Sequence, residues 1–160
     1  MTNLNRKSII IDIDQNGEII DWSNRDKIKR CILDLVSLCK RHDNVKIKEL
    51  KQDLGLFSFQ KEFGLVKLST ARQSGSTQAQ LQILREYENV CMICLSFHII
   101  KYLQRYNTDI KNKICHTSKF INESKHYEIV LVDNASHNEN VDRIIENCSY
   151  MDNCVCVLIG

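Results

Sequence analysis

The sequence contains no proline and only five glycines among its 160 residues. Linkers and disordered segments are usually rich in these residues, so their scarcity argues against both and favours uninterrupted helices and strands. No apolar run approaches the ~18 residues that a membrane-spanning helix needs, and residues 1–7 lack the apolar core of a secretion signal. These absences predict a cytosolic protein without a membrane partner.

A strong charge of either sign is also missing. The net charge is +2, so the chain has neither an overall basic field for nucleic acid nor an acidic tail. Its fractions of hydrophobic and charged residues are those of an ordinary globular protein. We therefore expect a single domain over residues 1–160, in which an N-terminal part, 1–55, packs on a core, 56–160.

Cysteine is abundant, with eight residues. Without a secretion signal, reduced and buried thiols are expected. Cys91 and Cys94 have the spacing of zinc ligands, and Cys115 directly precedes His116. Residues three apart on a strand point to opposite faces of a sheet, so we prefer core cysteines to a zinc site.

The N-terminal part is expected to form a β-hairpin followed by helices. Two β-rich runs, 8–13 and 18–22, flank an Asn-Gly pair, which is the strongest short signal for a hairpin turn. Apolar residues then recur at helical spacing over 23–41, and a second helical stretch covers 45–54. The lysines of this second stretch are interpreted as a solvated face, because no aromatic side chains alternate with them for nucleic-acid stacking.

Strand-like and helix-like runs alternate from residue 64 onward. Strands are expected at 65–68, 89–95, 128–132 and 154–159, and helices at 77–87, 97–106 and 138–148. The segment 107–125 is expected to be irregular, with 114–115 as a candidate edge strand. Strands joined by helices favour a mostly parallel sheet covered on both faces, that is, a three-layer α/β domain. We expect the strand at 65–68 to be central.

A short loop of small residues joins the first of these strands to the first helix. This is the setting of a phosphate-binding loop, G-x-x-x-x-G-K-[ST], in which backbone N–H groups hold phosphates, the lysine adds charge and the hydroxyl binds magnesium. Gly75 and Thr77 match the pattern. Thr70 stands at the position of the first glycine, and Ser76 stands at the position of the lysine.

A second motif lies at the end of the apolar strand 128–132. Asp133 follows this strand directly, as does the Walker B aspartate that holds magnesium in P-loop NTPases. The next position usually carries a glutamate that polarises the attacking water, and here it is Asn134. Because parallel strands bind ligands at their carboxyl ends, we expect Asp133 to lie near the loop.

At these residues the chain resembles the ATPase domain of the phage terminase large subunit, a P-loop motor of the helicase-related type. The loop of that family often reads S-R-Q-x-G-K-T, and this sequence is similar at Arg72, Gln73, Gly75 and Thr77. The pair Phe59-Gln60 resembles the family's aromatic-Gln element, which contacts adenine. The resemblance covers roughly residues 56–160.

The resemblance implies a three-layer sheet of the P-loop NTPase type and a site for ATP and Mg²⁺. The residues implied in binding nucleotide are Gln60, Arg72, Gln73, Ser74, Gly75, Ser76 and Thr77, with Mg²⁺ on Thr77 and Asp133.

Two departures from the family indicate that catalysis is lost. Ser76 removes the cation from the transferring phosphate, and Asn134 removes the water-activating carboxylate. We interpret the chain as a catalytically degenerate, terminase-like NTPase domain of viral origin. It would act as a binding or regulatory module in the host cytoplasm, with a protein partner or a second copy of itself.

Three alternatives stay open from the sequence. The chain could bind nucleotide or nucleic acid through a residual anion site at 75–77. It could hydrolyse nucleotide slowly with Arg72 in place of the lysine. The loop could also resemble a phosphate site by chance on an unrelated sheet.

Overall fold

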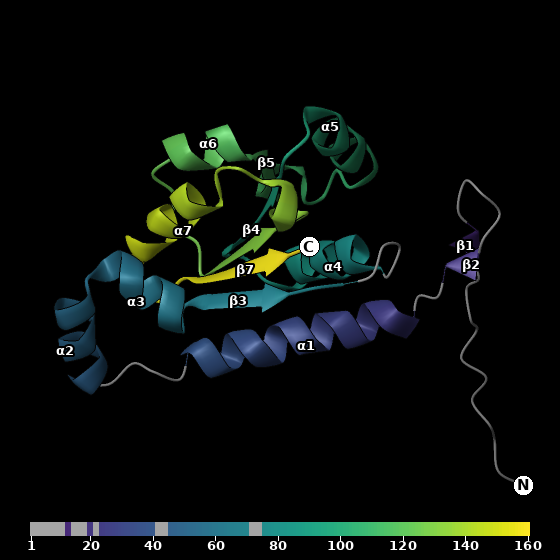
Figure 1. Ribbon diagram of the computed structural model, residues 1–160. Helices are drawn as coiled ribbons and strands as arrows, with labels where there is room; N and C mark the ends of the chain where they lie inside the picture. The colour runs from purple at the N-terminus through teal and green to yellow at the C-terminus, as the bar shows by residue number, and fades with distance from the viewer. Residues whose placement is uncertain (1–11, 14–18, 21–22, 41–44, 71–74) are drawn as a thin grey trace, which may run out of the picture.

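A five-stranded, all-parallel sheet forms the centre of the molecule (Figure 1). The computed structural model describes residues 12–13, 19–20, 23–40, 45–70 and 75–160. The strands of the sheet are β3 (Leu65–Leu68), β4 (Val90–Cys94), β5 (Ile114–His116), β6 (Ile129–Val132) and β7 (Val155–Ile159). They lie in the order β3-β7-β6-β4-β5. The predicted α/β class with a parallel sheet is confirmed.

Helices cover both faces of this sheet. They are α1 (Ser23–Lys40), α2 (Val45–Leu54), α3 (Leu56–Phe63), α4 (Ser76–Glu86), α5 (Phe97–Tyr106), α6 (Thr117–Asn122) and α7 (Val141–Ser149). On one face, α1, α4 and α5 contribute Ile32, Leu84 and Ile100 to a buried cluster. On the other face, α6 and α7 contribute Phe120 and Ile144 to a second buried cluster. The expected three layers are present.

The two central apolar strands are buried on both faces. Every residue of β4 and β6 is buried, which explains why their sequences are continuous apolar runs instead of alternating ones. Cys91 belongs to the cluster on the α7 face, whereas Cys94 belongs to the cluster on the α4 face. These two thiols therefore lie on opposite faces of the sheet, as the core interpretation predicted.

The position of β3 differs from the prediction. β3 lies at the edge of the sheet, because the last strand, β7, inserts between β3 and β6. The pattern within β3 fits this place, since Val66 is buried and Lys67 is exposed. A charged, outward-facing residue is typical of an edge strand. β7 is almost entirely buried and is suited to a position between two strands.

The segment 107–125 is more regular than the sequence predicted. After the 3-10 turn η1 (Lys111–Lys113) and the confirmed edge strand β5, it forms helix α6. The ring nitrogen Nδ1 of His116 accepts a hydrogen bond from the backbone N–H of Ser118, 3.2 Å away, and so caps this helix. Phe120 of α6 is buried against the second cluster. The helix was missed because it is only six residues long.

The N-terminal part contains the expected hairpin strands and helices. β1 (Asp12–Ile13) and β2 (Ile19–Ile20) pair antiparallel, and their predicted Asn-Gly turn lies outside the described residues. Helix α1 packs on α4, β3 and β7, which places it on the same face as α4, over the β3–β7 side of the sheet (Figure 1). No helix in the described ranges is long and apolar enough to span a membrane.

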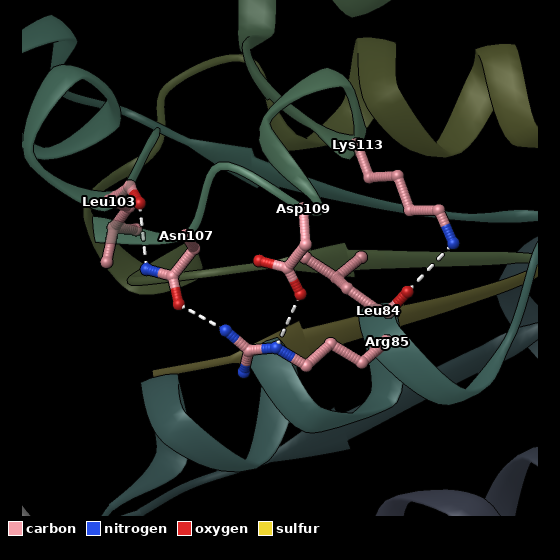
Figure 2. A network of polar contacts seen from close by, with 6 residues as sticks. All are labelled: Leu84, Arg85, Leu103, Asn107, Asp109 and Lys113. Carbon is pink, nitrogen blue, oxygen red and sulfur yellow. Dashed lines mark hydrogen bonds and ion pairs between the residues drawn. The ribbon is translucent and has the colours of Figure 1, made fainter. Parts of the chain in front are cut away.

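The C-terminal end of α4 is held by a lysine from η1. The ammonium of Lys113 donates hydrogen bonds to the carbonyl oxygens of Leu84, at 2.8 Å, and Tyr87, at 2.6 Å. Figure 2 shows the first of these bonds. The last carbonyls of a helix lack partners within the helix, and a cation there also complements the helix dipole. Lys113 therefore fastens α4 to the segment before β5.

Replacing Lys113 should destabilise the fold, because Lys113→Met removes both donors and leaves the part-buried carbonyl of Leu84 without its partner. We expect a loss of about 1–2 kcal/mol in the free energy of unfolding, measured by urea denaturation. The exposed Lys111 offers the matched control, and Lys111→Met should change stability by less than about 0.5 kcal/mol. Equal losses in the two variants would contradict the proposed role of Lys113.

Candidate functional site

Helix α4 begins at the carboxyl edge of the sheet, within the last residues of the predicted loop. Its N-cap residue, Gly75, has φ 84° and ψ 14°, a left-handed conformation that favours glycine. Glycine has no side chain with which to cap the first N–H groups of the helix, and a helix N-terminus attracts anions. Ala71, Arg72, Gln73 and Ser74 lie outside the described residues. The second half of the predicted loop thus forms a helix start suited to a phosphate.

Asp133 lies beside this helix start. It follows β6, is only 6% exposed, and its backbone N–H donates to the carbonyl oxygen of Ile93 at 3.0 Å. Its carboxylate accepts a hydrogen bond of 2.8 Å from Nε2 of Gln80, and the side chain of Thr77 lies close enough to lower its pKa. The structure therefore brings together Thr77 and Asp133, the two residues predicted to bind magnesium.

Gln80 is a member of this site that the sequence analysis missed. It follows Thr77 by three residues, so both side chains lie on the same face of α4. Gln80 is fully buried, and its Oε1 has no hydrogen-bond partner among the described residues. In the sequence, only the three-residue spacing from Thr77 pointed to Gln80. That spacing becomes informative once the structure shows that Asp133 faces this side of α4.

The electrostatics of the site are those of a buried acid among neutral partners. Burial raises the pKa of Asp133, and the hydrogen bonds from Gln80 and Thr77 lower it by less. The recorded donors are an amide and a hydroxyl, which carry no positive charge. A cation at this place would favour the ionised carboxylate.

The donor set fits magnesium held together with phosphate. Mg²⁺ prefers hard oxygen ligands and usually takes one or two from the protein, with water and phosphate oxygens completing its shell. Thr77 and Asp133 would supply such oxygens. The neighbouring Cys94 is not a competing ligand, because burial and the nearby Asp133 raise the pKa of its thiol to about 12. In the described parts of the chain, no three His, Cys, Asp or Glu side chains are grouped to hold a metal.

Gln60 does not join this site. Its amide donates to the carbonyl oxygens of Gly64, at 2.9 Å, and Cys154, at 3.0 Å, which directly precede β3 and β7. These contacts place Gln60 at the amino edge of the sheet, whereas Gly75 and Asp133 lie at the carboxyl edge. Gln60 is 5% exposed and ties together the beginnings of two neighbouring strands. The position of Gln60 therefore does not support the predicted contact with adenine.

Asn134 stands where the family has its catalytic glutamate, and the backbone conformation at this position favours asparagine. Its φ of 51° and ψ of 44° are left-handed, and it starts the 3-10 turn η2 (Ala135–His137). Asparagine adopts this conformation more readily than glutamate. The site thus lacks a proton acceptor next to Asp133 at this position.

Arg25 is a further neighbour of the loop that no local sequence pattern could reveal. A Cβ atom built on Gly75 would lie 3.5 Å from Cβ of Arg25, so the start of α1 packs against the loop glycine. Arg25 also pairs with Asp26 at 3.2 Å. The N-terminal part of the chain therefore takes part in building the surroundings of the site.

No protein-family model, curated protein or solved structure matches this chain.

The raised pKa of Asp133 predicts how Asp133→Asn changes stability with pH. A carboxyl group whose folded pKa exceeds the unfolded value of 3.8 favours the fold below pH 3.8 and loses this contribution as pH rises through the folded pKa. Asparagine removes the buried charge and keeps an acceptor for Gln80. We therefore expect Asp133→Asn to be more stable than the wild type at pH 7 without magnesium.

This gain should shrink as the pH falls towards the unfolded pKa, and urea denaturation over a pH series measures it. The claim that the buried, ionised carboxylate of Asp133 destabilises the fold would be refuted if Asp133→Asn were less stable than the wild type at pH 7 and the difference did not change with pH.

Proposed function

We propose that this chain is a catalytically degenerate, terminase-like NTPase domain that binds magnesium nucleotide and acts as a regulatory binding module. One observation carries the proposal. Asp133 comes from a distant part of the sequence and accepts a 2.8 Å hydrogen bond from Gln80, one turn after Thr77 on the same face of α4. Thr77 itself lies close enough to lower the pKa of Asp133. In P-loop NTPases, a loop Ser or Thr and the Walker B aspartate hold the magnesium ion together.

The order of the strands supports the same proposal. β7 lies between β3, which leads into the loop, and β6, which ends in Asp133. Because the strands are parallel, β3 and β6 end at the same edge of the sheet, where ligands of such sheets bind. A sheet that resembled a phosphate site by chance would have no reason to bring Thr77 and Asp133 together at this edge.

The residues of the site suit binding better than hydrolysis. The first N–H groups of α4 would face the phosphates, and Thr77 and Asp133 would hold the magnesium ion that neutralises them. Ser76 adds no positive charge to the transferring phosphate, and Asn134 accepts no proton from water. The protein partner, the self-association and the viral origin stay predictions.

A titration with a fluorescent ATP analogue tests this function, with Mg²⁺ present or removed by EDTA. We expect a dissociation constant on the order of 0.1–1 mM with magnesium, and weaker binding without it. Thr77→Ala should weaken binding about tenfold, whereas the exposed Thr108→Ala is the matched control and should leave it unchanged. No phosphate release above background is expected.

Ser76→Lys provides a second test of the same site. The substitution places a cation at the first residue of α4, where P-loop proteins have their lysine, and it should tighten binding about tenfold. If neither the wild type nor Ser76→Lys binds the analogue, the site is no nucleotide site. Asn134→Glu is less informative alone, because glutamate is disfavoured in the left-handed conformation of that residue.

A further inference from the structure

The outer face of α5 carries aromatic and cationic side chains in alternation. Ile100 and Leu103 are buried beneath the helix, and the exposed residues on the opposite side are His98, Lys101, Tyr102 and Arg105, with Tyr106 at their flank. Tyr102 is 59% exposed and Tyr106 is 65% exposed. The helix contains no acidic residue. Large exposed rings of this kind are characteristic of binding surfaces.

Basic residues outnumber acidic residues in the segment that contains α5. The segment 97–113 contains four Lys or Arg residues and one acidic residue, Asp109, while the whole chain has a net charge of +2. Asp109 accepts a 2.8 Å ion pair from Arg85 of α4, which lowers the pKa of its carboxyl group. The acidic group of the segment is thus bound to a cation outside the segment, and the surface suits a polyanion.

The same contacts fix α5 in place. Arg85 also donates to the side-chain oxygen of Asn107 at 2.6 Å, and Asn107 donates to the carbonyl oxygen of Leu103 at 2.8 Å (Figure 2). The C-terminal end of α5 is therefore attached to α4 by a polar network, while its inner face is attached by apolar burial. A rigid surface loses little conformational entropy when it binds a ligand.

The two tyrosine rings lie beside each other with their planes inclined by 52°, so they present two neighbouring faces and not one flat platform. The ring centroids of Tyr102 and Tyr106 are 4.8 Å apart, and the guanidinium of Arg105 lies over Tyr106 at 5.8 Å from the centroid. Helix α2 provides a contrast, because it also carries lysines but contains no aromatic residue. Aromatic rings together with cations bind single strands, since unpaired bases stack on the rings and phosphates meet the cations.

We infer that the outer face of α5 binds single-stranded nucleic acid, with bases on Tyr102 and Tyr106 and phosphates near Lys101 and Arg105. A duplex would not use the rings in this way, because its bases are already stacked and paired. The surface lies on a different helix from the magnesium and phosphate site and does not depend on nucleotide binding there.

Fluorescence anisotropy with labelled oligo(dT) and oligo(U) of about 12 nucleotides tests the inference. The full chain should bind both strands and should bind a labelled duplex of the same length at least about tenfold more weakly. Tyr102→Ala/Tyr106→Ala should weaken single-strand binding at least about tenfold. Lys101→Glu/Arg105→Glu should weaken it and reduce its dependence on salt.

The matched control is Lys46→Glu/Lys48→Glu on α2, which changes the net charge by the same amount at exposed positions. It should alter the affinity by no more than about twofold. Equal weakening by the two charge-reversal pairs, unchanged binding after loss of both tyrosines, or no binding by the wild type would overturn the inference. Urea denaturation of each variant checks that the exposed substitutions leave the fold intact.

Discussion

The burial of the Asp133 carboxylate is the constraint on which much of this structure depends. The carboxylate connects the end of β6 to α4 through its 2.8 Å hydrogen bond from Gln80, and Thr77 lies close enough to lower its pKa. Burying an acid costs free energy unless it is bonded or paired, and here the recorded partners are neutral. A core strand that ended in an apolar residue would avoid this cost. A cation at the site would favour the ionised carboxylate and so offset this cost.

The sequence was informative where one local pattern determines one outcome. The apolar runs of β4 and β6 predicted doubly covered strands, and their carboxyl ends predicted that Asp133 would approach the helix after the loop. It was uninformative where the outcome depends on distant segments. The edge position of β3 results from the insertion of β7, and the place of Gln60 results from carbonyl groups in two strands. Tertiary packing determines both features, and neither produces a periodic pattern in the sequence from which it could be predicted.

The molecule presents two candidate binding surfaces whose physical character differs. One is a partly buried oxygen site at the carboxyl edge of the sheet, where Thr77 and Asp133 meet. The other is the exposed outer face of α5, where rings and cations are presented by a helix fixed to α4.

The central claim is that Thr77 and Asp133 hold a divalent cation together with a nucleotide. Paramagnetic broadening of amide NMR signals by trace Mn²⁺, recorded with and without ATP, tests it most directly. The account predicts that ATP focuses the broadening on residues 75–77 and 133–134, and that Asp133→Asn abolishes this effect. Broadening that ATP does not change, or that persists in Asp133→Asn, would contradict it.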